Sequence, residues 1–250
     1  MKEITISPEF VKKSNVLLSK LSKDTAFKTR LFKEFNKDAD FIKESIELCQ
    51  NALSAEDEYE KETKEATAAK DDFEKKYNAA RFNYTRHTSF LKLLLKYDVK
   101  KQTALGLIGR EEPKSQEEWF IHALDVYDKI IGDSSAAGLM GEYNFTLPDL
   151  RQGHQSVVEA HSANDTLAKE SAEAKSAMFN KDLTFNDLYD RMQFIQYFCY
   201  YIFLKEPKRL KELGLPIIDN EIGALINVKA KDMVKDASIT KDMVKDASIT

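Results

Sequence analysis

The sequence predicts an all-α protein, and three observations carry that prediction. Between Pro8 and Gly106 the chain contains neither proline nor glycine, and between Asp149 and Glu206 the only such residue is Gly153. Both stretches are rich in Lys, Glu, Ala and Leu, which favour helices. Neither shows the alternation of apolar and polar residues that indicates a strand. We therefore expect two long helical stretches with helix breakers clustered between them.

Capping signals place the first short helices. Ser7 followed by Pro8 is typical of a helix start, so a helix should run from there to about Leu21. Asp24 can cap a second short helix, which holds several phenylalanines. Two short helices are therefore expected before the first long one.

The first long helix is expected from Asp38 to about Gln102. Its apolar residues follow the 3-4-4-3-4 spacing of one helix face, and they are Ala66, Ala69, Phe73, Tyr77, Ala80 and Tyr84. A helical hairpin that turns near Ser54 is the alternative, because "SAED" at that point is another capping pattern.

A linker helix and a second long helix follow. Ser115 with Glu118 three residues later forms a capping box for "SQEEWFIHALDVYDKII", which Gly132 closes. Thr146, followed by Leu-Pro, opens the second long stretch, and Pro207 ends or kinks it.

The sequence also contains an internal repeat with a period of 108 residues. At this shift "KETKEATAA" (61–69) lies over "KESAEAKSA" (169–177) with five of nine residues identical, and "LGL" at 105–107 lies over "LGL" at 213–215. The apolar stripe is retained, with His87 aligned to Ile195. Upstream, "SPEF" aligns with "SQEEW" after a slip of one residue. Chance similarity of two helices rich in Ala, Lys and Glu is the alternative.

The repeat predicts the architecture. We expect two tandem pseudo-repeats, 7–108 and 115–216, each with short helices and one long helix ending at Leu-Gly-Leu. Two such units most simply pack their long helices antiparallel into one elongated bundle, as in a coiled coil. Residues 1–220 are then a single all-α domain. Residues 221–250 are a tail with the duplicated decapeptide "KDMVKDASIT", for which we expect little order.

The order of these features resembles a family of uncharacterised bacterial all-helical proteins with tandem units. Members carry a long helix rich in Ala and Glu, an aromatic segment, a terminal "LG" motif and a linker helix bearing Trp and Tyr. The resemblance covers about residues 25–216 and implies no established activity, cofactor or functional residue. The tail beyond Pro216 and the Phe/Tyr-rich stretch at 194–203 depart from the family's pattern.

Composition excludes several function classes. Charged residues make up 32% of the chain but the net charge is only −4, without the basic excess of a nucleic-acid-binding protein. The two cysteines, Cys49 and Cys199, lie far apart and predict buried thiols in a reducing compartment. The first residues lack the apolar core of a signal peptide. These observations favour a cytoplasmic protein.

The sequence lacks the common nucleotide-binding and hydrolase motifs. The sequence contains no GxxxxGK[ST], GxGxxG, HExxH or GxSxG motif. Glu118 with His122, and His154 with His161 and nearby Glu159, could each share a helix face, but such pairs are incomplete ligand sets. His87 aligns with an isoleucine, which favours a core histidine with a local hydrogen bond. We therefore expect no catalytic residue, metal or cofactor.

The candidate interaction residues are aromatic. "FIQYFCYYIFL" (194–204) is apolar on every side, so it lies either at the centre of the bundle or on a surface for a partner or membrane. In the linker helix, Trp119 and Tyr127 lie on one side with Phe120 and Ile130, which indicates core packing or a binding groove. The possible interaction surface is Trp119, Tyr127, Tyr197, Tyr200 and Tyr201.

The leading hypothesis is a non-catalytic, soluble helical scaffold that binds a protein partner or a second copy through the faces of its long helices. A membrane-active, pore-forming-like bundle that uses 194–204 is the alternative. An enzyme or metalloprotein with a site that carries no sequence motif is a third.

Overall fold

The computed structural model describes residues 7–109 and 113–216, and these residues form helices and no strand. The all-α prediction is therefore confirmed for the described residues. The duplicated decapeptide, with the rest of the predicted tail, lies outside them. The helices are α1 (Pro8–Lys23), α2 (Thr25–Phe35), α3 (Ala39–Leu94), α4 (Val99–Ala104), α5 (Gln116–Gly132), α6 (Ser134–Gly141), α7 (Leu147–Ile202) and α8 (Pro207–Leu213).

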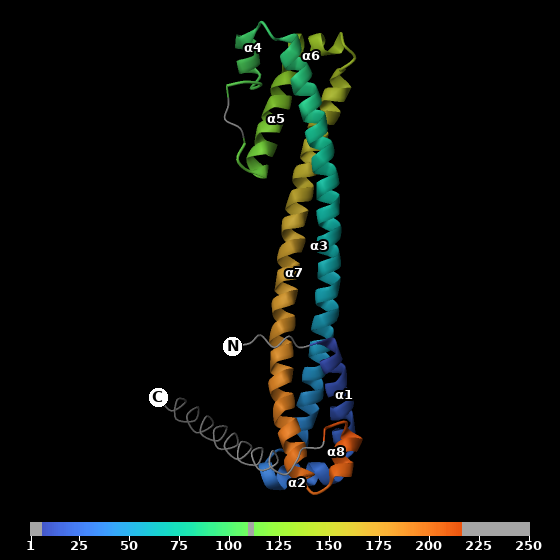
Figure 1. The fold of residues 1–250 in the computed structure, drawn as a ribbon. Coiled ribbons are helices and arrows are strands. Elements are labelled where there is room, and N and C mark those ends of the chain that lie inside the picture. The colour runs from blue at the N-terminus through green and yellow to red at the C-terminus, as the bar shows by residue number, and fades with distance from the viewer. Residues whose placement is uncertain (1–6, 110–112, 217–250) are drawn as a thin grey trace, which may run out of the picture. The chain divides into compact units, whose positions relative to one another are not determined.

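The chain divides into two compact units. Unit 1 takes in the residues up to Glu60 and those from Ser176, and unit 2 comprises Lys61–Lys175. Each unit contains one end of α3 and the opposite end of α7, so the two long helices run antiparallel within a unit (Figure 1). Helices α1, α2 and α8 complete unit 1, whereas α4, α5 and α6 complete unit 2 (Figure 1). The units therefore differ from the predicted pseudo-repeats, since each unit combines parts of both, and the predicted single domain over 1–220 stays a prediction.

The core of unit 1 is made by five helices. Leu18 and Leu21 of α1 and Phe27 of α2 are fully buried together with Cys49 of α3 and Ile195 of α7. Leu210 and Leu213 of α8 close the same cluster. Rings add contacts, with the Phe35 and Phe198 centroids 4.4 Å apart. The burial of this one cluster fixes α1, α2 and α8 on the long helices.

Unit 2 has two neighbouring clusters. Phe120, Ala123 and Tyr127 of α5 are fully buried against Ala80 of α3 and Val157 of α7. Beyond them, a second cluster joins the end of α3 to α5, α6 and the start of α7, and its members are Leu91, Leu95, Leu105, Leu107, Val126, Ile130, Ala136, Met140 and Leu150. Helix α5 belongs to both clusters, so it is the element on which the packing of unit 2 depends.

Helix starts follow the predicted caps. The Ser7 hydroxyl accepts from the Phe10 N–H, and the Ser115 hydroxyl accepts from the Glu118 N–H at 3.1 Å. The Asp38 carboxylate accepts from the Phe41 N–H at 3.2 Å at the start of α3. Helix α3 is continuous through Ser54, so the hairpin alternative is wrong.

The two long helices correspond in length and position. Helices α3 and α7 each have 56 residues, and their bounds differ by 108 at both ends. The caps Ser7 and Ser115 also differ by 108, whereas the buried Val11 and Leu21 of α1 differ by 109 from the buried Phe120 and Ile130 of α5, in line with the one-residue slip predicted at "SPEF". The extra residue lies within the helix that follows, since α1 has 16 residues and α5 has 17.

The turn after each long helix is built by the same backbone hydrogen bonds. The Asp98 N–H donates to Leu95 O and the Glu206 N–H donates to Phe203 O, both at 2.8 Å. In each "LGL" the glycine, Gly106 or Gly214, has a positive φ (74° and 81°), which a residue with a Cβ adopts only with strain.

These turns correct the predicted end of the first long helix. It ends at Leu94 and not near Gln102, because Asp98 caps the separate helix α4 by accepting from the Lys101 N–H at 2.9 Å. The "LGL" motifs accordingly end α4 and α8 and not the long helices themselves. Helix α6 was not predicted, since its sequence "SSAAGLMG" is short and contains two glycines.

An aspartate joins three helices in each unit. Asp24 separates α1 from α2, caps α2 and pairs with Arg209 of α8 at 2.8 Å. Asp133 separates α5 from α6, caps α6 and pairs with Lys101 of α4 at 3.3 Å. Each carboxylate therefore links the junction between two short helices to a third short helix. That third helix, α8 or α4, is the one that follows a long helix in the chain.

We predict that Asp133→Ala lowers the free energy of unfolding of unit 2 by about 1 kcal/mol, the usual cost of losing an N-cap. Hydrogen bonds from the α6 backbone, led by Ala136, hold the pKa of Asp133 below its ordinary 3.8. A lowered folded-state pKa means that this stabilisation is present above the unfolded pKa and is lost as the pH falls through the folded pKa.

Urea unfolding of wild type and variant at pH 7 and pH 3 measures the effect, and the difference between them should shrink at the lower pH. Asp133→Asn is the matched control, because an asparagine still caps the helix but forms no ion pair with Lys101. A difference that is independent of pH would contradict the role of the ionised carboxylate.

Candidate functional site

The structure places the five predicted interaction residues in two separate groups. Trp119 and Tyr127 lie in unit 2, whereas Tyr197, Tyr200 and Tyr201 lie in unit 1. Tyr127 is fully buried, so its place in a predicted interaction surface is corrected to a place in the core. The other four side chains are half-buried.

The apolar segment 194–204 lies mostly in the core of unit 1. Ile195, Phe198, Cys199, Ile202 and Phe203 are buried, and only its two end residues count as exposed. The ring of Phe203 stacks on Phe27 at 5.9 Å. The segment therefore takes the core position, which is one of the two positions expected for a helix that is apolar on every side. This position does not favour the membrane-active alternative.

The most unusual polar contact of the core is a histidine–tyrosine pair in unit 2. The Nδ1 atom of His87 lies 3.0 Å from the Tyr127 hydroxyl, and both side chains are buried. Gly153 of α7 makes this possible, because a Cβ at that position would lie 2.3 Å from the Tyr127 hydroxyl oxygen. His87 thus has the local hydrogen bond that the sequence predicts.

Electrostatics keep this pair neutral. Burial lowers the pKa of His87. The positive charge of Arg86 lowers this pKa further, whereas the negative charge of Asp149 raises it. Burial also raises the pKa of Tyr127. A neutral imidazole and a neutral phenol satisfy each other, and neither is open to a substrate. The arrangement is that of a satisfied polar pair in a core and provides no accessible acid, base or nucleophile.

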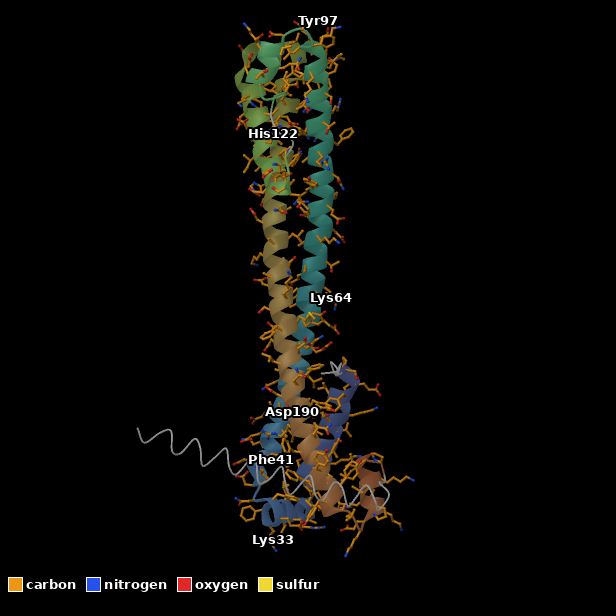
Figure 2. All side chains as sticks on the ribbon, turned by 60° about the vertical axis from the view of Figure 1, so that its left-hand side comes forward. Lys33, Phe41, Lys64, Tyr97, His122 and Asp190 are labelled. Atoms are coloured by element: carbon orange, nitrogen blue, oxygen red, sulfur yellow. The ribbon has the colours of Figure 1, made fainter. Side chains whose placement is uncertain are left out.

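The other histidines also join helices of unit 2. His154 lies 3.3 Å from Asp128, and His161 lies 3.1 Å from Glu117, so both link α7 to α5. Figure 2 labels His122 on α5, whose ring packs edge-to-face with Tyr84. The predicted sharing of a face by His154, His161 and Glu159 does not create a ligand set, because Glu159 accepts from Gln155 instead.

One group of carboxylates has the spacing for a metal ion. Among the described residues, Glu62, Glu65 and Glu170 place carboxylate oxygens within 4.8 Å of one another. Lys61 pairs with Glu62 at 2.9 Å, and Lys169 pairs with Glu170 at 3.3 Å. These ion pairs lie within α3 and within α7 and supply positive charge beside the carboxylates, and acidic groups of this kind are common without a metal.

The cysteines are buried free thiols, as predicted. Cys49 and Cys199 both lie in the core of unit 1. Burial raises the pKa of each thiol, which suppresses the reactive thiolate. They therefore serve as small apolar side chains.

Unit 1 has a concave surface formed by its first three helices. An open groove of about 390 Å³ in unit 1 is lined by residues of α1, α2 and α3, including Lys28, Ile42, Lys43 and Glu47. Its wall mixes both charges with apolar side chains. In the part of the chain that the structure describes, no helix combines the length and apolar character needed to cross a bilayer.

Exposed apolar side chains on α7 form the best surface candidate, and the sequence reasoning did not single them out. Phe179 is 67% exposed, and Met178 and Leu183 are 49% and 48% exposed. Phe179 and Leu183 are four residues apart and share a helix face. At the 108-residue shift their counterparts on α3 are Lys70, Asp71 and Lys75, which are exposed and charged. A comparison of the two repeats at these positions could have identified Met178, Phe179 and Leu183 from the sequence.

No protein-family model, curated protein or solved structure matches the chain.

We predict that Gly153→Ala destabilises unit 2 by about 1–3 kcal/mol, the usual range for overpacking a core. The added methyl would have to displace the Tyr127 ring, whose Cζ atom would lie 2.7 Å away. Thermal and urea unfolding measure the loss. Gly138→Ala in α6 is the control, since nothing lies within 4 Å of its Cβ position, and it should be neutral or slightly stabilising.

We predict that His87→Ile destabilises unit 2 by about 1–3 kcal/mol because it leaves the buried Tyr127 hydroxyl without its partner. Adding Tyr127→Phe should recover most of that loss. Because the folded-state pKa of His87 lies below the ordinary 6.5, the unfolded chain binds the proton more readily, and wild-type stability falls as the pH falls below the unfolded pKa.

The His87→Ile/Tyr127→Phe double variant should therefore lose less stability between pH 7 and pH 5 than the wild type does. Urea unfolding at both values measures this. An equal loss in both proteins would assign the pH dependence to other groups.

Proposed function

We propose that the chain is a non-catalytic helical interaction protein, built from two tandem pseudo-repeats, that acts as a scaffold for a protein partner. The repeat proposal is supported by the equal lengths and 108-residue offset of α3 and α7. It is also supported by the shared turn hydrogen bonds and the paired Asp24 and Asp133 junctions. Whether the pseudo-repeats form one elongated bundle, as the sequence predicts, stays a prediction.

The single observation that carries the interaction function is the exposed apolar face of Met178, Phe179 and Leu183. The repeat provides an internal control for this face, because charged residues occupy the equivalent positions 70, 71 and 75 of an equally long helix. The fold therefore does not require apolar side chains there. Large apolar side chains that the fold does not need are typical of surfaces that a partner covers.

The chemistry of the molecule supports the same proposal. The buried polar pair is neutral and enclosed, the thiols are buried, and the clustered carboxylates are paired with lysines. A protein–protein contact needs none of these groups to be reactive. It requires a stable helical surface, which the two long helices provide.

We predict that Phe179→Lys/Leu183→Lys abolishes the binding of a partner that wild-type protein retains from the native host's extract. The reason is that lysine removes the apolar area that would be buried and adds two charges to the face. Affinity capture with quantitative mass spectrometry measures the difference. Asp71→Asn/Lys75→Gln, at the equivalent positions of α3, is the matched control and should retain the partner.

Circular dichroism must show the same helix content in all three proteins. A partner retained equally by wild type and Phe179→Lys/Leu183→Lys would remove this face from the proposal. The absence of any retained partner would remove the interaction function itself.

A further inference from the structure

Helices α1 and α5 hold equivalent places in the two units, yet they carry opposite charge. Each begins at a serine cap, and the two caps are 108 residues apart. Helix α1 contains four lysines and one glutamate, whereas α5 contains four acidic residues and one lysine. Since both helices bury a similar apolar face, the difference in charge is confined to what each presents to solvent.

The exposed face of α1 is a basic stripe. Successive positions in a helix differ by about 100°, which places the exposed Lys12, Lys13, Lys20 and Lys23 on one side. Val16 lies among them and is 56% exposed. The only acid of this helix, Glu9, is paired with Lys13 at 2.9 Å. We call this surface the basic stripe.

The exposed face of α5 is an acidic stripe of the same design. Glu117, Asp125 and Asp128 lie on one side of the helix with Ile121 among them, which is 61% exposed. Glu118 borders this face. Glu117 and Asp128 also contact His161 and His154 of α7, and Asp125 contacts Lys129. We call this surface the acidic stripe.

We propose that the basic stripe of one chain binds the acidic stripe of a second copy of the same chain. The occupant is inferred from charge complementarity: each stripe has one exposed β-branched apolar residue and an excess of one charge around it. The excess is four lysines against Glu9 on α1, and four acidic residues against Lys129 on α5. Opposite charges that flank an apolar contact select the partner and register of a helix pair. The contact rests on the proposed interaction function but uses a surface separate from Met178, Phe179 and Leu183.

The two stripes lie on different parts of the chain, which determines the kind of assembly. When one such contact joins two copies, one copy keeps a free acidic stripe and the other keeps a free basic stripe. Association therefore either closes as a dimer in which both contacts form, or continues into a ring or an open chain of copies. Two helices of this length bury a small interface, so the contact should be weak, concentration-dependent and sensitive to salt.

Sedimentation equilibrium of the full chain tests the proposal. At low salt the weight-average mass should rise with concentration above the monomer mass of 28.6 kDa, and high salt should return it to the monomer. Lys12→Glu/Lys23→Glu removes the excess of positive charge from the basic stripe, and Glu117→Lys/Asp128→Lys removes the excess of negative charge from the acidic stripe. Each variant alone should remain monomeric, because its changed stripe has lost the excess charge that attracts the other stripe of a second copy.

Sedimentation of an equimolar mixture of the two variants is the decisive experiment. The first variant retains the acidic stripe and the second retains the basic stripe, so these two unchanged stripes can bind each other and the equimolar mixture should recover association. Lys33→Glu/Lys208→Glu is the control, since it changes the net charge of unit 1 by the same amount at exposed residues outside α1. It should associate as the wild type does. Circular dichroism confirms that each variant folds.

Three outcomes would overturn the proposal. The wild type could stay monomeric at the highest soluble concentration in low salt, or the mixture could fail to associate. Alternatively, the wild type could stay monomeric yet co-sediment with vesicles that contain phosphatidylserine while Lys12→Glu/Lys23→Glu does not, which would assign the basic stripe to a membrane surface. None of these results bears on the partner retained through Phe179 and Leu183.

Discussion

Each unit depends on the burial of the apolar stripes of α3 and α7 against one another and under shorter helices. A long helix with a single apolar stripe gains most of its stability from covering that stripe, because helix propensity alone contributes little. In unit 1 the cover is α1, α2 and α8, and in unit 2 it is α4, α5 and α6. The ion pairs of Asp24 and Asp133 then hold the covering helices to each other. These polar contacts add to the apolar packing and do not replace it.

The two units satisfy this constraint with different side chains. Unit 1 is filled by phenylalanines and two buried thiols, whereas unit 2 contains all four histidines. The position held by His87 in one unit is held by Ile195 in the other, and both are buried. A polar pair that an isoleucine can replace in an equivalent position is not required by the fold. It is retained in unit 2 because Tyr127 and Gly153 leave His87 with a satisfied hydrogen bond.

Much of the fold could be predicted from the sequence because its signals are local. Ser7, Asp24, Asp38 and Ser115 cap helices where the pattern places them, since a cap depends on a few neighbouring residues. The end of α3 could not be predicted, because the apolar residues continue through a turn that Asp98 closes. The exposure of 194–204 and of Tyr127 also could not be predicted. An aromatic residue suits a core and an interface equally, and only the packing of other helices decides between them.

The repeat is most informative where its two copies differ. Buried positions change among side chains that fill space, which packing permits as long as volume and polarity are satisfied. Exposed positions change from charged to apolar at 70, 71 and 75 against 178, 179 and 183, and from basic to acidic between α1 and α5. Folding does not demand either change, because the equivalent helix forms with the opposite choice. Differences that leave the fold intact and change only the surface can give the two repeats different binding partners. Both proposed contacts therefore involve exposed helix faces and not the buried His87–Tyr127 pair.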